Sequence, residues 1–302
     1  MRFINPKTDF AFKKIFGSDR SKGILISFLN ALLYEERPVI VELEILAPYL
    51  APKIQGMKDT FVDVRARLQN GHRVIIEMQV LNVEGFEKRV LYNAAKAYST
   101  QLLAGENYKE LHGVVALTIT DFVMFPECPD LQSAYALKEK TRLTDYSEGD
   151  LELVFVELPK FKKSLEELAT VKDKWLYFLR NAPDLQMIPE AMEAVPEIRE
   201  AFQIANEANM SAEELYIQER KIIYILDQRG AIIKAEREGL ERGMAKGLEK
   251  GLEKGLAEGL EKGRDEMARK IACHLLAQMT DQEIAEATGL SLTEVSALRA
   301  ER

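Results

Sequence analysis

The stretch TFVDVRARLQNGHRVIIEMQV, residues 60–80, decides the fold because it predicts a β-hairpin. Apolar and polar residues alternate along both of its arms, which is typical of strands that bury one face and leave the other to polar groups. The arms meet at Asn70-Gly71, a dipeptide that strongly favours a tight hairpin turn. The chain therefore contains at least one antiparallel strand pair with a dry face and a polar face.

The register of this hairpin determines what its polar face can do. A two-residue turn would place Asp63 opposite Met78 and mix polar with apolar side chains. A three-residue loop, with Gly71 in the left-handed conformation, places Asp63 opposite Glu77, and we expect this register. It also pairs Val62 with Met78, Val64 with Ile76 and Ala66 with Val74. The two carboxylates would then stand roughly 5 Å apart at Cβ. Like charges that close repel unless a proton or a cation lies between them, so the hairpin predicts a metal site.

The ligands of this predicted site are oxygen atoms. Asp63 and Glu77 supply carboxylates from adjacent strands, and the backbone carbonyl of Met78 could add a third ligand. Gln79 can hydrogen-bond to water or to a phosphate oxygen but cannot take a proton. Oxygen ligands favour Mg²⁺ or Mn²⁺, ions that neutralise charge developing on a phosphate. The hairpin alone is equally compatible with a solvated face whose carboxylates pair with the hairpin's own arginines.

Composition narrows the class of protein. The 302 residues are 47% hydrophobic, enough for a large core, and the formal net charge is −8. This charge gives no overall attraction to DNA, so DNA binding must be local or assisted by a metal. Cys128 and Cys273 lie far apart, the three histidines are isolated, and no apolar run approaches ~18 residues. We therefore expect a cytoplasmic protein without disulfides, without a zinc site and without a membrane partner.

Strands and helices alternate through the first half of the chain. Helices are predicted over residues 8–16, 21–34 and 85–104, and strands over 39–46, 113–120, 135–143 and 151–158. This order indicates an α/β fold with a mixed sheet flanked by helices. After Pro159 only helical patterns recur, which predicts an all-α C-terminal region. We expect a domain over 1–160, a helical region over 161–235, a glycine-repeat helix or linker over 236–270, and a tail over 271–302.

Glycine recurs at every fourth position from Gly239 to Gly263, and leucine or methionine follows most of these glycines. Each glycine costs a helix ~1 kcal/mol relative to alanine, so the isolated segment should be a frayed helix. Its period drifts around a helix and leaves two alternatives open. The repeat is either a semi-flexible spacer or a close helix-helix contact in a homo-oligomer.

The C-terminal tail ends in TDQEIAEATGLSLTEVSALRAER, which predicts two short helices with Gly289 in the turn between them. This pattern resembles a helix-turn-helix motif, in which Thr293 and Arg299 of the second helix would contact DNA. The alternative is a plain helical hairpin that serves as a cap or as a dimer contact.

These motifs together resemble the PD-(D/E)XK nuclease superfamily, which carries an aspartate on one strand and Glu-x-Lys on the next. They are more similar still to its recombination-promoting nuclease (Rpn) branch, a transposase-like group in which glutamine commonly replaces the lysine. Three segments match that branch: NPKTDFAFKKIFG at residues 5–17, VDVRA…IIEMQV in the hairpin, and the glycine-repeat tail. The resemblance covers the whole chain. It implies that Asp63 and Glu77 are metal ligands and that Gln79 stands where a catalytic lysine usually stands, which leaves the proton acceptor open.

Further site residues are expected on the helices that flank the hairpin. Asp9 is a candidate for the acidic residue that related nucleases carry on their first helix, or is a helix-start charge favourable to the helix dipole. Lys13 and Lys14 on the same helix could contact DNA phosphates. Arg89 and Lys96 lie seven residues apart, hence on one helical face, and could do the same.

The leading hypothesis is an Mg²⁺-dependent DNA endonuclease that hydrolyses phosphodiester bonds and is associated with recombination or mobile elements. One alternative is a DNA-binding or regulatory protein whose nuclease fold has lost its activity. The other is an oligomerising interaction module in which the glycine repeat does the biological work.

Overall fold

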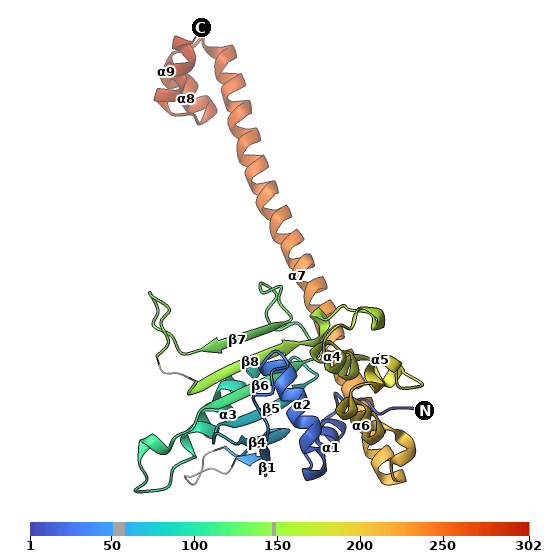
Figure 1. Cartoon of the computed structure of the whole chain (residues 1–302). Helices are drawn as coiled ribbons and strands as arrows, with labels where there is room; N and C mark the ends of the chain where they lie inside the picture. The colour runs from blue at the N-terminus through green and yellow to red at the C-terminus, as the bar shows by residue number, and fades with distance from the viewer. Residues whose placement is uncertain (51–57, 147–148, 302) are drawn as a thin grey trace. The chain divides into compact units, whose positions relative to one another are not determined.

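The computed structural model describes residues 1–50, 58–146 and 149–301. A six-stranded mixed sheet lies at its centre, in the order β1-β4-β5-β6-β8-β7 (Figure 1). Its strands are β1 (Leu43–Leu46), β4 (Val64–Leu68), β5 (Arg73–Gln79), β6 (Val114–Thr120), β7 (Gln132–Ala136) and β8 (Leu151–Glu157). Strands β5, β6 and β8 run parallel, and the other neighbours are antiparallel. A separate pair joins β2 (Tyr49–Leu50) to β3 (Thr60–Phe61). The predicted α/β class with a mixed sheet is confirmed.

The hairpin of β4 and β5 has the expected register over its length. Val64 pairs with Ile76 and Ala66 pairs with Val74. Four residues, 69–72, connect the two strands, and the Leu68 N–H donates to the His72 carbonyl at 2.8 Å, so the tight loop ends at Gly71. The φ of Gly71, +84°, lies in the left-handed region that glycine adopts without strain. The turn chemistry therefore sets the register, as the sequence predicts.

Helices cover both faces of the sheet. One face packs against α1 (Asp9–Phe16), α2 (Lys22–Leu33), α4 (Val171–Asn181) and α6 (Pro196–Ala205), and α2 crosses in front of the strands in Figure 1. The rings of Trp175, Phe16 and Phe28 meet there with centroids 4.6–5.7 Å apart. Each such buried side chain stabilises the fold by roughly 1.5–3 kcal/mol. The opposite face is covered by α3 (Phe86–Ser99), so the polar face of the hairpin is not open to water along its whole length.

The sequence predicts a domain boundary at residue 160, but the structure divides the described chain elsewhere. Side chains of α4, α5 (Glu190–Glu193) and α6 belong to the same core as those of α1 and α2. The described chain divides instead into two compact units, Met1–Arg229 and Gly230–Arg302. Residues 161–205 do not form a separate layer, because the apolar side chains of their helices pack in the same core as those of α1 and α2.

The glycine repeat lies within one continuous helix, α7 (Ala212–Leu275), whose first turns belong to the first unit. In the second unit the end of α7 packs with α8 (Asp281–Thr288) and α9 (Leu292–Ala300) around a small core that includes Ile284 and Val295. Gly289, with φ +77°, makes the predicted turn between α8 and α9. Among the described residues, no helix is both long enough and apolar enough to cross a membrane.

The strand predicted over 135–143 is displaced. Strand β7 ends at Ala136, and the chain then makes a single bridge between Lys138 and Asp145. Residues 137–146 are exposed, and Leu143 has a φ of +56°, which lies outside the strand region. The apolar pattern there has no opposing layer to bury it.

Candidate metal centre at the open end of the hairpin

Asp63 lies directly before β4, where the strand departs from the ladder. Its backbone N–H donates to the Ile76 carbonyl at 3.1 Å, although Ile76 already pairs with Val64. Two residues of one arm therefore face one residue of the other, a β-bulge that bends the strand and redirects a side chain. The Asp63 carboxylate accepts the Met78 N–H at 2.7 Å. The expected direct pairing of Asp63 with Glu77 is corrected accordingly, and the carboxylate lies at the end of the ladder instead.

The same bend overturns the expected pairing of Val62 with Met78. The Val62 N–H donates to the Pro48 carbonyl at 3.1 Å, and its side chain packs with Phe86 on the α3 side of the sheet. Because a strand residue directs its N–H and its carbonyl to the same side, the Met78 carbonyl also lies at this open end. That is the position required of the predicted backbone ligand.

Helix α1 brings Asp9 and Lys13 to Asp63. Thr8 begins the helix by accepting the Ala11 N–H at 3.3 Å, which fixes Asp9 in the first turn. The Lys13 ammonium is 2.5 Å from an Asp9 oxygen and 3.5 Å from an Asp63 oxygen. The two aspartates also share a hydrogen bond. Residues 54 positions apart in the sequence thus meet at one point.

The pKa values of the two aspartates shift in opposite directions. Burial, followed by the hydrogen bond to Asp9, raises the pKa of Asp63 to about 7. Burial also acts to raise the pKa of Asp9, but hydrogen bonds from Asp63 and Lys13 outweigh it and hold this pKa below its usual value. The contact therefore favours a protonated Asp63 beside an ionised Asp9.

Glu77 faces α3. The Arg89 guanidinium donates from one nitrogen to Glu77 at 2.6 Å and to the Gln79 side-chain oxygen at 2.8 Å. Burial raises the pKa of Glu77, while Arg89 and a hydrogen bond from Asn93 oppose the rise. Glu77 and Gln79 therefore take their cation from α3, not from the hairpin's own Arg65 or Arg73.

The charge of Lys13 acts on both acids. Its ammonium, 3.5 Å from an Asp63 oxygen, lowers the pKa of Asp63 and also that of Glu77. The side chains of Asp63 and Glu77 are only 12% and 16% exposed. The candidate centre thus consists of two desolvated acids at the end of the ladder, with Asp9 beside them and Lys13 and Arg89 as counter-ions.

These residues fit a hard divalent cation. Across residues 1–50, 58–146 and 149–301, no three acidic, histidine or cysteine side chains already surround one point. The donors at hand are the oxygens of Asp63, Glu77 and the Met78 carbonyl, the type that Mg²⁺ and Mn²⁺ prefer alongside water. Both acids have raised pKa values, so their charges lack full compensation. An ion would take over the role that Lys13 and Arg89 fill in this conformation.

The raised pKa of Asp63 predicts an unusual pH dependence. Between about pH 4 and pH 7 the unfolded chain has lost a proton that folded Asp63 keeps, so the free energy of unfolding falls as pH rises. We expect the metal-free protein to lose about 1–3 kcal/mol across this window and the Asp63→Asn variant to lose less. The lowered pKa of Asp9 acts only below this window, where it removes stability as pH falls. Urea unfolding in EDTA at pH 4.5 and 7.5 measures the difference.

The exposed Asp184 provides the control for this experiment. An Asp184→Asn variant should follow the wild-type pH profile, since it removes one exposed carboxylate and leaves Asp63 in place. If wild type and Asp63→Asn gave parallel profiles, Asp63 would not be protonated in the folded protein near neutral pH.

Lys96 corrects a prediction. The expected position beside Arg89 on a phosphate-facing surface is wrong, because Lys96 is 4% exposed. Its ammonium donates to the Lys58 carbonyl at 2.7 Å and lies 5.9 Å from the centre of the Tyr92 ring. Helical spacing places Lys96 on the inner side of α3, where a backbone carbonyl satisfies its charge.

Replacing Lys96 with methionine should therefore destabilise the fold instead of weakening DNA binding alone. The Lys96→Met variant keeps the apolar stem but leaves the Lys58 carbonyl without its charged donor. We expect a loss of about 1.5–3 kcal/mol in the free energy of unfolding. Chemical denaturation measures it, with the exposed Lys109→Met as the matched control. Equal stabilities would mean that the Lys96 contact does not hold in solution.

The remaining predicted DNA contacts are engaged within the chain. Lys14 forms an ion pair with Glu214 at the start of α7. In the tail, Arg299 donates to Asp281 at 2.6 Å and to the carbonyls of Leu276 and Met279 at 2.6 and 2.9 Å, so it closes the end of α7. This arrangement corresponds to the plain helical cap.

Thr293 lies in the first turn of α9, the helix that the sequence suggests would contact DNA. Its hydroxyl lies 3.0 Å from that of Ser291, the N-cap of α9. Thr293 therefore takes part in helix capping, and the structure supplies no support for base contacts by Thr293 or Arg299. DNA contact by these residues stays a prediction from the sequence.

Two residues near the centre were not singled out from the sequence. Asn93 is buried on α3 and hydrogen-bonds to Glu77. Asp121 directly follows β6, donates its N–H to the Gln79 carbonyl at 2.9 Å, and binds Lys7 and Arg229 at 3.1 and 2.6 Å. Asp121 could have been found, because polar residues at the carboxyl ends of neighbouring parallel strands meet at one sheet edge.

Comparison with known proteins supports the same fold. Residues 6–235 match the family described as PD-(D/E)XK nuclease family transposase. The match spans the sheet, its covering helices, the candidate centre and the first turns of α7. No match was found among curated proteins or among solved structures. The matched segment covers well over half of the 302 residues, and the chain therefore belongs to the PD-(D/E)XK nuclease family transposases.

Proposed function

We propose that this chain is a metal-dependent endonuclease that hydrolyses phosphodiester bonds of DNA during recombination or the movement of mobile elements. Nuclease chemistry is what the family implies. The observation that supports it most strongly is the convergence of Asp63 and Glu77. Burial raises the pKa of both acids, and each holds a counter-ion from a different helix.

In this proposal Asp63, Glu77 and the Met78 carbonyl hold Mg²⁺ or Mn²⁺, and Asp9 stabilises the charge of the ion from α1. The ion, when bound, neutralises charge on the scissile phosphate and lowers the pKa of a water molecule. Gln79 orients water or a phosphate oxygen by hydrogen bonding and transfers no proton. Arg89, once released from Glu77, can contact the phosphate.

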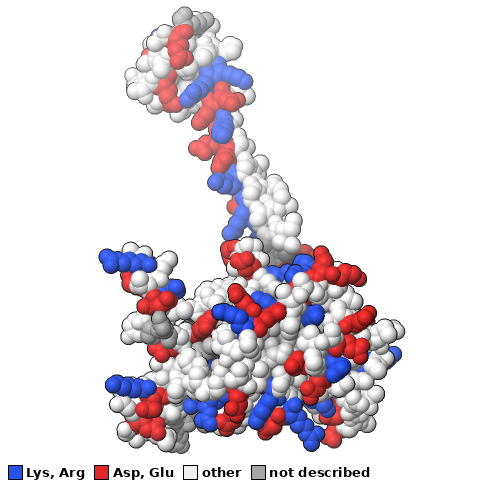
Figure 2. Space-filling view, in the orientation of Figure 1, with Lys and Arg blue, Asp and Glu red and all other residues white. Residues whose placement is uncertain are grey.

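DNA binding by this protein has to be local. The net charge is −8, and on the face drawn in Figure 2 acidic and basic side chains are interspersed. Lys13 and Arg89 already lie at the candidate centre, where a phosphate and a metal ion could replace their present partners. We place this activity in the cytoplasm, since Cys128 and Cys273 are free thiols.

Nicking of supercoiled plasmid DNA by the full chain tests the proposal. We expect open circles with Mg²⁺ or Mn²⁺ and none with EDTA. Mn²⁺ should also raise the melting temperature more at pH 8 than at pH 6, because Asp63 must release its proton to become a ligand. Nicking that continues unchanged in EDTA, or a melting temperature indifferent to Mn²⁺, would overturn the metal-dependent mechanism.

A second candidate, an oligomerising module, is favoured by one observation on α7. Six apolar side chains that follow the repeat glycines are 62–69% exposed: Leu240, Met244, Leu248, Leu252, Leu256 and Leu260. A contiguous exposed apolar stripe of this length is typical of an interaction surface. Sedimentation of the full chain and of a chain ending at residue 238 separates the candidates. A nuclease keeps weak nicking when shortened, whereas an interaction module loses both its assembly and its activity.

A further inference from the structure

A cavity of about 460 Å³ opens beside the candidate metal centre, between β3 and the start of α3. Its principal walls are formed by Lys58, Thr60, Phe86, Lys88, Arg89 and Tyr92. The cavity volume lies within the range of small-molecule sites. The proposed metal ligands, Asp63, Glu77 and Met78, do not line this cavity.

The cavity is positively charged in a negatively charged protein. Three cations line it, Lys58, Lys88 and Arg89, against a single acid, Glu84. Neither Lys58 nor Lys88 forms an ion pair with any residue that the structure describes. Unpaired lysines with long flexible stems are suited to phosphate oxygens.

The wall of the cavity includes a buried hydroxyl group. Thr60 is 7% exposed, and its hydroxyl has no hydrogen-bond partner among the described residues. The Arg89 Nε is also buried without a hydrogen-bond partner among the described residues, although another nitrogen of its guanidinium donates to Glu77. Buried polar groups in folded proteins are normally hydrogen-bonded, so these two leave room for a water molecule, an ion or a polar ligand group.

Flat groups complete the wall. Tyr92 is partly exposed, and the Arg89 guanidinium lies 5.0 Å from the centre of the Phe86 ring. Aromatic rings and guanidinium planes are the surfaces on which proteins stack unpaired nucleobases. Lys96 holds this wall in place by binding the Lys58 carbonyl and lying over the Tyr92 ring.

Arg89 connects the cavity with the metal centre. The same guanidinium that lines the cavity reaches Glu77 at 2.6 Å and Gln79 at 2.8 Å. A nucleotide held in the cavity would therefore be covalently linked to a phosphate near the acidic pair. A fully paired duplex cannot place a base there, because its bases are stacked inside the helix.

We propose that this cavity binds one unpaired nucleotide of the substrate strand, next to the phosphate that is cleaved. The preferred substrate is then DNA with an extruded or unpaired base. This inference rests on the proposed nuclease function and specifies its substrate class. Stacking on Tyr92 holds the base, while Lys58 and Lys88 hold its phosphates.

Binding of a 20-base-pair duplex that carries one bulged 2-aminopurine tests the inference. The assay uses the full chain in Ca²⁺ so that DNA is bound without turnover, and compares the bulged duplex with a fully paired one. We expect wild type to prefer the bulged duplex about tenfold and the fluorescence of the probe to change on stacking. Tyr92→Ala and Lys88→Gln should each reduce this preference severalfold.

Matched controls keep the result interpretable. Tyr108→Ala and Lys109→Gln replace the same residue types at exposed positions away from the cavity, and should leave the preference unchanged. Equal affinity of wild type for bulged and paired duplexes, or an unaltered preference in both cavity variants, would overturn the inference. A preserved preference without any Mg²⁺-dependent nicking would support the cavity and overturn the nuclease instead.

Discussion

Glu77→Gln abolishes metal-dependent nicking, with an expected fall of about a thousandfold in the cleavage rate. The substitution keeps the size of the side chain and its ability to accept from Arg89, but removes the charge that would hold the ion. A thousandfold loss corresponds to about 4 kcal/mol in activation free energy. Plasmid nicking in Mg²⁺ and in Mn²⁺, measured at equal protein concentration, gives the ratio of rates.

The fold of the Glu77→Gln variant should survive intact, which separates a catalytic effect from a structural one. Burial already raises the pKa of Glu77, so a neutral side chain costs little at this position. The free energy of unfolding without metal should stay within about 1 kcal/mol of wild type. The exposed Glu110→Gln variant controls for the loss of one negative charge. If the purified Glu77→Gln protein kept a tenth of the wild-type rate, Glu77 would not be a metal ligand.

The parts of the centre that depend on local periodicity were predictable from the sequence. Alternation and the glycine turn set the pairing of Val64 with Ile76, and the helix predicted over residues 8–16 carries Asp9 in its first turn. The bulge at Asp63 was not predictable, since it arises where Val62 turns to pack on the α3 side of the sheet. That packing depends on α3, a helix more than twenty residues further along the chain, so the alternation of residues in the hairpin cannot predict it.

Charged residues were harder to place than apolar ones. Spacing correctly put Lys96 on one face of α3 but could not show that this face meets the Lys58 carbonyl. Likewise Arg299 was expected to face DNA and instead closes the end of α7. Long cationic side chains reach several alternative partners, so their contacts are decided by tertiary structure after the backbone is fixed.

The cations at the centre explain how two crowded acids persist without metal. Lys13 and Arg89 offset the charges of Asp63 and Glu77, and a proton on Asp63 removes the rest of the repulsion. If a divalent ion binds as proposed, it would replace both cations as the partner of these acids. Lys13 and Arg89 would then be free to contact a phosphate, which would link metal loading to substrate binding.

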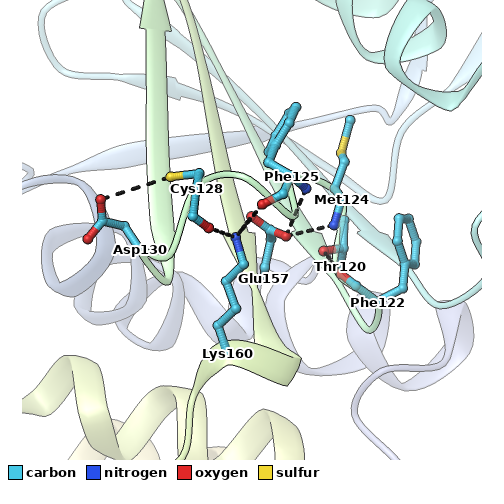
Figure 3. A network of polar contacts seen from close by, with 8 residues as sticks. All are labelled: Thr120, Phe122, Met124, Phe125, Cys128, Asp130, Glu157 and Lys160. Atoms are coloured by element: carbon cyan, nitrogen blue, oxygen red, sulfur yellow. Dashed lines mark hydrogen bonds and ion pairs between the residues drawn. The ribbon is translucent and has the colours of Figure 1, made fainter.

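Lys160→Met gives the largest expected loss of stability, about 3–5 kcal/mol in the free energy of unfolding. Figure 3 shows the network around Glu157, which is 1% exposed at the end of β8. Its carboxylate forms a 2.5 Å ion pair with Lys160 and accepts the N–H groups of Met124 and Phe125 at 2.6 and 3.2 Å. Without Lys160 the carboxylate would remain buried with no opposite charge, which is the costliest way to break such a pair.

A double variant distinguishes this electrostatic cost from a loss of packing. In Lys160→Met with Glu157→Gln the buried charge is gone and the Gln oxygen can still accept from Met124, so a large part of the lost stability should return. Urea unfolding of wild type, both single variants and the double variant gives the coupling energy, with the exposed Lys162→Met as the control. If the double variant were no more stable than Lys160→Met alone, the loss would come from the carbonyls of Phe125 and Cys128 that Lys160 also binds, at 3.0 and 2.6 Å. Either outcome identifies what holds the loop that begins at Asp121, beside Gln79, and therefore what keeps this edge of the candidate centre in place.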